Sequence, residues 1–241
     1  MTDPALRLAP MAKRLGRGAA LTSDDCAAVL AMPHVAREFE AGQYLLREGD
    51  RPKYCSFMLS GFTYRHKFVG DGGRQIVSIH IPGDFIDLQN MLLDTADHNI
   101  QALTGSVVAQ VDVEVVAAHS FAHPGLGRGF WRESLVEASI FREWVANIGR
   151  RDARSRTAHL LCELATRREA AGLGARDTFE LPMTQEQLGD ALGLTAVHVN
   201  RTLKALHDDG LITRSKRSVS IADWARLRDT ADFTSGYLHL A

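Results

Sequence analysis

The segment from Pro182 to Ile221 constrains the fold most strongly, because it contains helix-starting and helix-ending residues in a fixed order. Thr184 is followed three residues later by Gln187, which is the capping-box pattern that begins a helix. Gly193 can adopt the left-handed conformation that ends this helix, and Thr195 is a suitable N-cap for another. The segment therefore predicts a helix, a glycine-containing turn and a second helix, which together form a helix-turn-helix unit.

The second helix of this unit is predicted to have an apolar face and a polar face. Gly210 ends it, and the short apolar segments 211–213 and 219–221 predict two strands around a polar hairpin tip. The unit is therefore predicted to be a winged helix-turn-helix. The inward positions are Val199, Thr202, Leu203 and Leu206, and the outward positions are Ala196, Val197, His198, Asn200, Arg201 and Lys204.

The outward face and the hairpin tip have the chemistry of a DNA-binding surface. Asn200 and Arg201 are the residue types that pair with adenine and guanine edges in the major groove. Residues 210–222 contain basic side chains but no acidic one, which favours contact with phosphates over simple packing in a helical core. The predicted DNA-binding residues are Thr184, Gln185, Thr195, Ala196, Val197, His198, Asn200, Arg201, Lys204, Arg214, Lys216, Arg217 and Ser218.

The composition is that of an ordinary globular protein. The 241 residues suffice for two domains, and 45% are hydrophobic and 24% charged. A net charge of −1 means that affinity for DNA must come from a local basic patch. Cys26, Cys55 and Cys162 are scattered, which indicates a reducing compartment. We expect a cytoplasmic protein without a membrane partner, since neither a signal-peptide core nor a long apolar run occurs.

The region from about residue 35 to residue 118 is predicted to be mostly β. Glycines punctuate it, and alternating segments at 54–59, 74–79 and 107–113 are typical of strands in a sandwich or jelly roll. Asp71 to Gly73 is suited to a hairpin turn between the segments Phe68-Val69 and Ile76-Val77. Before this region, Thr22 to Asp25 supplies candidate helix caps.

Residues from about 129 onward change to helical periodicity, with apolar residues at three- and four-residue steps. Such a helix could lie on the β domain, but the stripe resembles a coiled-coil seam and favours a dimerisation helix. Asp152 is a cap residue at which this helix is expected to break, forming a hinge. The stripe consists of Trp131, Leu135, Ala138, Phe141, Val145 and Ile148.

Sequence motifs of common enzymes are absent. The sequence has no Walker phosphate loop, no GxSxG elbow and no HExxH zinc motif. The glycine run at 70–73 lies between predicted strands rather than at the start of a helix, where it would bind phosphate. We therefore expect a protein that is not an enzyme.

The order of a β-roll, a long helix and a winged helix-turn-helix resembles the Crp/Fnr family of bacterial transcription regulators. Pro82–Ile86, Ser155–Ala165 and Thr184–Lys204 carry the resemblance most specifically. It implies an α+β fold in which residues 1–128 form a sensor β-roll, a jelly roll with the cyclic-nucleotide-binding fold. Residues 129–152 would form the long dimerisation helix and hinge, and residues 153–241 the winged helix-turn-helix domain.

The same resemblance implies a homodimer that binds a pseudo-palindromic double-stranded promoter site, and RNA polymerase as a partner if the protein is an activator. An event in the β-roll would reorient the two DNA-binding domains through the long helix. The alternative is a cyclic-nucleotide-fold module that acts through protein partners. Arg201 and the basic hairpin argue against that alternative.

The phosphate-binding cassette of the cyclic-AMP-responsive relatives is altered here. Counted from Gly83, Leu88 takes the place of the family's Glu, and His98 and Asn99 take the places of its Arg–Ser pair. Because these charged groups are missing, we predict that the protein does not bind cyclic AMP tightly and does not respond to it. The roll could instead be a ligand-free scaffold or could bind another effector. The candidate effector pocket comprises Asp87, Leu88, Gln89, His98, Asn99, Phe141 and Arg142.

We predict no cofactor and no metal site. An iron–sulfur cluster generally needs four thiolates, and the sequence contains three cysteines. Haem or another small-molecule effector is an alternative suggested only by ten histidines, among them His119 and His123, and packing explains such residues more simply. Cys26 or Cys55 as a redox switch would require a lowered thiol pKa.

The resemblance also assigns roles in the second helix. Arg201 matches the family arginine that reads a guanine, whereas Val197 replaces a common Glu, and Ala196 replaces a longer side chain. Because valine can contact a thymine methyl but cannot accept from cytosine, the half-site should differ at that base pair. Thr184, Gln185, Thr195, His198 and Lys204 are expected to contact phosphates. The sequence leaves the effector, the target genes and the sign of regulation open.

Overall fold

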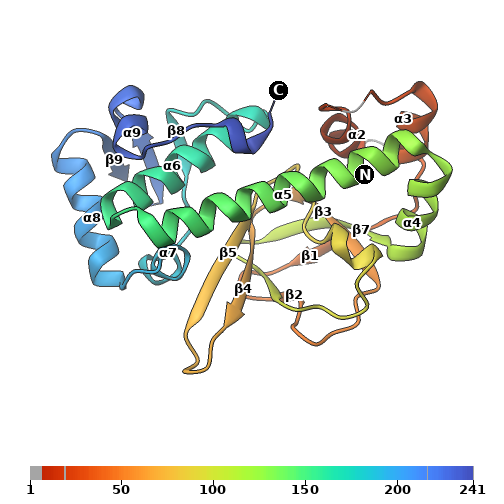
Figure 1. Ribbon diagram of the computed structural model, residues 1–241, viewed down its shortest axis with the longest axis horizontal. Helices are drawn as coiled ribbons and strands as arrows, with labels where there is room; N and C mark the ends of the chain where they lie inside the picture. Colours follow the sequence, from red (N-terminus) through yellow and green to blue (C-terminus); the bar gives the residue numbers. More distant parts are fainter. Residues whose placement is uncertain (1–6, 19, 216, 241) are drawn as a thin grey trace. The chain divides into compact units, whose positions relative to one another are not determined.

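A computed structural model of the chain describes residues 7–18, 20–215 and 217–240. The chain divides into two compact units (Figure 1). The first comprises the described residues of 1–66 and 79–138, and the second comprises those of 67–78 and 139–240. No helix in these described ranges is long and apolar enough to cross a membrane.

The β-roll is built on antiparallel sheets, whose residues belong to the first unit except for 67–78 of the β4–β5 hairpin. One sheet has the order β1–β7–β3, formed by Val35–Phe39, Ser106–Asp112 and Tyr54–Ser60. The other has the order β2–β6–β4–β5, formed by Tyr44–Leu46, Asn99–Ala102, Thr63–Phe68 and Arg74–His80. Gly72, with φ of 82°, provides the tight turn between β4 and β5. The predicted β-roll and its hairpin at 71–73 are therefore confirmed.

One part of the β prediction is wrong. Residues 113–118 belong to helix α4, Val113–Ala122, rather than to a strand. The side chain of Asp112 accepts a hydrogen bond from the backbone N–H of Glu114 at 2.9 Å, which caps the helix directly after β7. The valines here have high β propensity, but the cap favours a helix, and Val116 of this helix packs in the apolar core cluster.

The Pro82–Ile86 motif links the roll to the long helix α5, Pro124–Arg150. Phe85 makes edge-to-face contacts with Phe57 of β3 at 5.1 Å and with Phe130 of α5 at 5.8 Å between ring centroids. Asp84 accepts from the backbone N–H of Ile81 at 2.8 Å, which holds the motif's turn. Phe130 also packs in an apolar cluster with residues from α2, Ala9–Leu15, and α3, Ser23–Leu30.

The predicted caps of two helices are confirmed. Thr22 and Asp25 form a capping box at the start of α3. Asp152 accepts from the backbone N–H of Ser155 at 2.8 Å and caps α6, Ala153–Ala170, so the long helix breaks where the sequence predicts. The helix α5 begins at Pro124, which is earlier than predicted, because proline is well tolerated in the first helical turn.

The second unit surrounds the helix-turn-helix with further elements. It contains α7, Gln185–Leu192, and α8, Ala196–Asp208. The strands β8, Thr178–Glu180, β10, Ser218–Ile221, and β9, Ile212–Ser215, form an antiparallel sheet in that order. The chain continues into α9, Trp224–Thr230, and a short 3-10 turn at Gly236–Leu238.

A buried carboxylate lies at the centre of this unit. Glu163 of α6 is fully buried and accepts hydrogen bonds from Trp144 Nε1 at 3.0 Å, Arg167 Nη1 at 3.0 Å and Tyr237 Oη at 2.8 Å. Burial and the neighbouring Glu163 raise the pKa of Tyr237, which keeps its hydroxyl protonated as a donor. The carboxylate thus joins α5, α6 and the C-terminal segment.

Two glycines fix the turn between α7 and α8. Gly193 has φ of 64° and ends α7 in the left-handed conformation, as predicted. Gly189 faces the backbone of the turn, and a Cβ there would lie 2.4 Å from the carbonyl oxygen of Leu194. The backbone can approach this closely only because Gly189 lacks a side chain.

We predict that Gly189→Ala destabilises the protein although alanine is the better helix former. The backbone clash should cost ~1–3 kcal/mol, as overpacking in a dense core does. Gly149→Ala is the matched control, because Gly149 lies in α5 with nothing within 4 Å of its added Cβ. There the substitution should stabilise by up to about 1 kcal/mol. Thermal unfolding followed by circular dichroism tests this, and a melting temperature for Gly189→Ala at or above that of wild type would contradict it.

Candidate nucleic-acid interface and effector region

Side-chain caps fix the starts of both helices of the helix-turn-helix. The Thr184 hydroxyl accepts from the backbone N–H of Gln187 at 3.1 Å, and the Gln187 side chain accepts from the N–H of Thr184 at 2.9 Å. The Thr195 hydroxyl accepts from the N–H of His198 at 3.2 Å. Both predicted helix starts are therefore confirmed. Gln185, the first residue of α7, is half-buried.

The faces of α8 are arranged as the periodicity predicts. Its four inward residues, Val199, Thr202, Leu203 and Leu206, are buried. On the outer face, Val197 is 80% exposed, and Asn200, Arg201 and Lys204 are exposed. Ala196 and His198, in the first turn, are half-buried. The helix therefore presents a large apolar side chain, an amide and two cations to the solvent.

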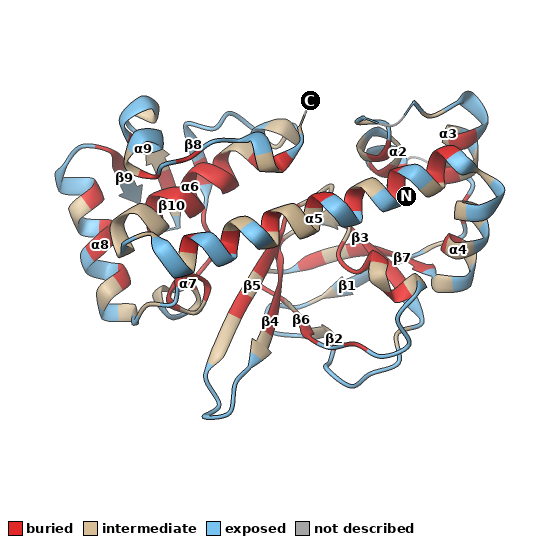
Figure 2. Cartoon of the chain, in the orientation of Figure 1, coloured by how far each residue is buried: buried red, intermediate tan, exposed pale blue. Residues whose placement is uncertain are grey.

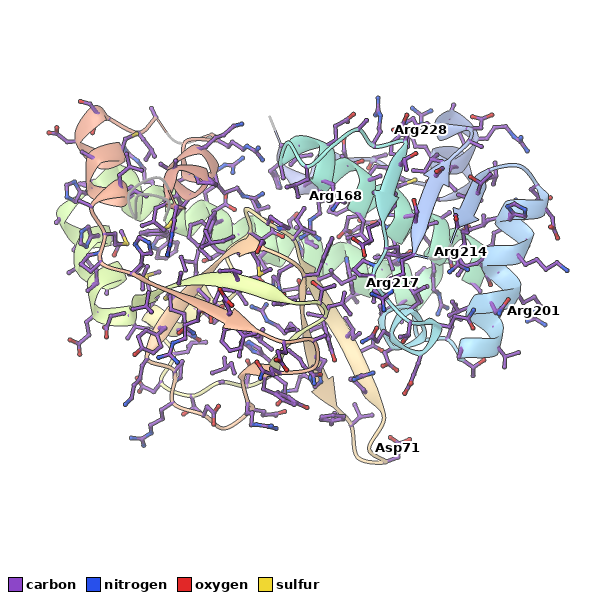
Figure 3. The ribbon with its side chains drawn as sticks, turned by 180° about the vertical axis from the view of Figure 1, so that it is seen from behind. Asp71, Arg168, Arg201, Arg214, Arg217 and Arg228 are labelled. Atoms are coloured by element: carbon purple, nitrogen blue, oxygen red, sulfur yellow. The ribbon has the colours of Figure 1, made fainter. Side chains whose placement is uncertain are left out.

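The hairpin of β9 and β10 carries further basic side chains. Arg214 and Arg217 are exposed and Ser218 is half-buried, whereas Lys216 lies outside the described residues. Figure 3 labels Arg201 on α8 and the two hairpin arginines, all of which belong to the second unit. The strand β8 pairs with β10 through the register Val219↔Phe179 and supports the hairpin from its other edge. The sequence patterns missed β8 because it is only three residues long.

The first unit brings some of the predicted effector-pocket residues together. Gln89 Nε2 lies 3.5 Å from His98 Nε2, and the other ring nitrogen of His98 lies 2.6 Å from Asp97. Leu88 is buried in the 3-10 turn Leu88–Met91. Asn99 accepts from the backbone N–H of Glu48 at 3.1 Å, so its side chain is already engaged. Phe141 and Arg142 belong to the second unit.

Asp87 is also used within the protein. Its Oδ1 accepts from the backbone N–H of Ser56 at 2.6 Å, and burial raises its pKa to about 7. Asp87 lines a cavity of about 280 Å³ together with Ser56, Asn90 and Gln110. The residues at the altered cassette positions do not line this cavity.

An ion pair that the sequence patterns missed lies inside the first unit. Arg65 is buried and donates from Nη1 to Glu137 at 2.6 Å, and its Nη2 donates to the carbonyl of Ile86. His80 Nε2 lies 4.0 Å from the same carboxylate, and His80 Nδ1 lies 3.1 Å from the Thr63 hydroxyl. Burial alone would raise the pKa of Glu137, but Arg65 and His80 lower it, so the carboxylate is anionic.

Buried and exposed residues alternate along the long helix (Figure 2), and several of the exposed residues are apolar. Glu133, Val136, Ile140, Trp144 and Asn147 are buried. The predicted dimer residues Trp131, Leu135 and Val145 are 70%, 62% and 72% exposed, and Ala138, Phe141 and Ile148 are half-buried. Ile148 is close to the helix-turn-helix, since a Cβ on Gly193 would lie 3.4 Å from its Cγ2.

Cys55 and Cys162 are buried, and His119 and His123 contact groups within the protein. Burial raises the pKa of Cys55 well above its usual range and that of Cys162 to about 12, so neither is a ready thiolate. The His119 ring contacts the carbonyl of Val115 at 2.8 Å, and His123 Nδ1 lies 3.7 Å from Asp25. Within the described ranges, no group of three or more His, Cys, Asp or Glu side chains has the geometry to hold a metal ion. A cluster held by four thiolates would need one more cysteine than the sequence contains.

Comparison with known families assigns both units. Residues 36–118 match the cyclic nucleotide-binding domain, and residues 155–230 match the Crp-like helix-turn-helix domain. The transcriptional activator protein FnrL of Cereibacter sphaeroides is 31% identical over 199 residues, which cover 81% of this chain and 79% of FnrL. The nitrogen fixation regulation protein FixK of Bradyrhizobium diazoefficiens is 30% identical over 216 residues, covering 88% and 90% of the two chains.

Solved structures show the same fold. FixK2 from Bradyrhizobium japonicum matches with a TM-score of 0.78 and 23% identity, over 84% of this chain and 100% of FixK2. A CRP/FNR-family transcriptional regulator from Thermus thermophilus matches with a TM-score of 0.65 and 16% identity, over 83% and 99% of the two chains. With this fold, these relatives and the exposed basic face of α8, the chain belongs to the Crp/Fnr family, and it is a DNA-binding transcription regulator rather than an enzyme.

Proposed function

We propose that the protein is a cytoplasmic homodimer that binds a pseudo-palindromic promoter site, each protomer placing α8 in the major groove of one half-site. The observation that carries this proposal is the outer face of α8, where Val197, Asn200 and Arg201 are exposed beyond the cap at Thr195. Helix-turn-helix regulators contact base edges with the N-terminal part of this helix and bind as two-fold dimers. RNA polymerase would be a further partner if this protein, like the relative named a transcriptional activator, activates transcription.

The exposed side chains of α8 divide into base-reading and phosphate-binding groups. Arg201 has the planar donor arrangement that pairs with O6 and N7 of guanine, and Asn200 can pair with adenine. Val197 offers only apolar contact, which suits a thymine methyl. The residues we assign to phosphates are Thr184, Gln185, Thr195, His198, Lys204, Arg214, Lys216, Arg217 and Ser218, whereas Ala196 stands in place of a longer side chain.

The helix starts support the phosphate assignment. The N-termini of α7 and α8 present backbone N–H groups and the positive end of the helix dipole, which attract phosphate oxygens. Thr184 and Thr195 are located at these two ends. Phosphate contacts of this kind would position α8 without selecting a sequence.

The exposed apolar stripe of α5 is the proposed dimer contact. Trp131 and Leu135 border a groove of about 730 Å³ in the first unit, together with Leu92 and Phe121, which are 73% and 83% exposed. An apolar surface of this extent on a helix with a coiled-coil-like spacing is typical of a protein interface. A second copy of the same helix would cover it.

We further propose that the β-roll does not bind cyclic AMP tightly. Leu88 is buried and apolar, and burial lowers the pKa of His98, which keeps its ring neutral rather than cationic. Neither residue can supply the charged hydrogen bonds that a ribose hydroxyl and a cyclic phosphate require. The effector, if one exists, therefore has a different chemistry.

Selection of bound sequences from randomised DNA tests the proposed function. We expect a pseudo-palindrome whose half-sites are centred about one helical turn, 10–10.5 base pairs, or a multiple of it apart. A monomer-sized site without symmetry, or enrichment of no sequence, would contradict the proposal.

We predict that Arg201→Ala removes the preference for one base pair in each half-site, at a cost of about 1–3 kcal/mol per half-site. Affinity for random DNA should change much less. The control is Lys204→Ala, which should weaken binding to all sequences and reduce the salt dependence instead. Fluorescence anisotropy on the selected site and on substituted sites measures both effects, and equal losses on specific and random DNA would refute the role of Arg201.

We predict that Val197→Glu changes the preferred half-site rather than abolishing binding. A carboxylate at this position can accept from the N4 amino group of cytosine, so the selected base pair should change to one that presents cytosine. Val197→Ala is the control and should broaden the preference without creating a new one. Repeating the sequence selection with each variant checks this, and an unchanged site for Val197→Glu would show that residue 197 does not face a base.

We predict that Leu135→Glu dissociates the dimer, because it places a charge in an apolar seam that becomes buried on association. Sedimentation velocity should show a monomer at concentrations where the wild type is a dimer. The control is Leu93→Glu, the same change at an exposed leucine in a loop outside α5. A Leu135→Glu variant that remains dimeric would place the interface elsewhere.

A further inference from the structure

The guanidinium of Arg156, in the first turn of α6, joins the ends of two other helices. Its Nε donates to the carbonyl oxygen of Arg151 at 2.8 Å, directly after the last residue of α5. Its Nη1 donates to the carbonyl oxygen of Leu192 at 3.0 Å, and Leu192 is the last residue of α7. All three segments belong to the second unit, so one side chain connects the hinge to the turn of the helix-turn-helix.

Both acceptors are groups that a helix leaves unpaired. The last carbonyls of a helix have no partner within it, and they form the negative end of the helix dipole. A guanidinium is permanently charged and directs several N–H donors in one plane, so it can bind two such carbonyls at once. A lysine ammonium is a single point and cannot span them in the same way.

The surroundings of Arg156 allow little movement. A Cβ added to Gly193 would lie 3.6 Å from Arg156 Nη1 and 3.4 Å from Ile148 Cγ2, so the turn lies near both the guanidinium and α5. Asn147 of α5 donates to the carbonyl of Arg156 at 3.4 Å. The end of α7, just before this turn, is therefore bonded to α6 through Arg156, and α6 is bonded in turn to the end of α5.

We propose that Arg156 is a positioning residue for DNA recognition: by fixing the helix-turn-helix to the end of α5, it sets the half-site spacing that the dimer accepts. The residue itself contacts no base. In a dimer formed through α5, the direction in which each α8 leaves its own α5 determines the distance between the two recognition helices. This inference rests on the proposed dimer.

The test compares Arg156→Ala and Arg156→Lys with Arg154→Ala. Arg154 lies in the same turn of α6 but is partly exposed and pairs with Asp209, so it is a matched arginine without the two carbonyl contacts. Affinities are measured on the selected site, on the same site with one base pair added or removed at its centre, and on a single half-site. One base pair moves the second half-site by about 3.4 Å along the duplex.

The wild type and Arg154→Ala should strongly prefer the selected spacing. Arg156→Ala should lose roughly tenfold or more in affinity at that spacing, since two charge-assisted hydrogen bonds are removed, and it should bind all spacings nearly equally. Its affinity for the single half-site should stay near that of wild type, which shows that the domain remains folded. Arg156→Lys should restore part of the spacing preference.

Two results would overturn the inference. One is an Arg156→Ala variant whose affinities for the three spacings stand in the same ratio as those of the wild type. This holds even if the variant binds every DNA, including the single half-site, more weakly. The other is a wild type without any spacing preference, which would refute the proposed symmetric dimer as well. Because the first result leaves the wild-type preference intact, the failure of the inference is distinguishable from the failure of the proposed function.

Discussion

The DNA-binding unit depends on one buried carboxylate. Glu163 has no exposed surface, and a carboxylate in such a place is tolerated only when donors satisfy it. The donors come from the long helix through Trp144, from α6 itself through Arg167 and from the C-terminal segment through Tyr237. The recognition helix α8 packs on the same α6 that carries this carboxylate. The helix on which α8 packs is thus fixed by the hydrogen bonds of Glu163.

Local sequence patterns predict the parts of the structure that local interactions determine. Thr184 with Gln187, Gly193 and Asp152 each act within a few residues of chain, and the corresponding caps and breaks are found where the spacing places them. The β prediction fails at 113–118 because valine-rich segments favour strands, whereas Asp112 caps a helix here and Val116 packs in the apolar cluster. The strand β8 and the contact between Tyr237 and Glu163, 74 residues apart, depend on distant segments that a local pattern does not connect.

The β-roll shows the same limit at its candidate site. Counting from Gly83 identifies which charged groups the chain lacks at the cassette positions, but it does not reveal what the interior contains instead. Arg65 and Glu137 are 72 residues apart, and neither belongs to a recognisable motif. The Glu137 carboxylate pairs with the buried Arg65 guanidinium and lies near His80, so the positive charge of Arg65 is neutralised within the protein. A ligand for this roll would therefore enter an interior that already contains a neutralised pair.

The apolar side chain of Val197 on α8 would make the proposed DNA binding depend on the methylation of the target. In the proposed complex Val197 would face a base pair in the major groove. Because its side chain has no polar atom, it would respond there to a methyl group at C5 of a pyrimidine and to little else. Cytosine methylated at C5 presents that same group in the same place. A regulator that recognises its half-site in this way would be sensitive to DNA methylation at one position, whereas a relative with glutamate there would instead recognise the cytosine amino group.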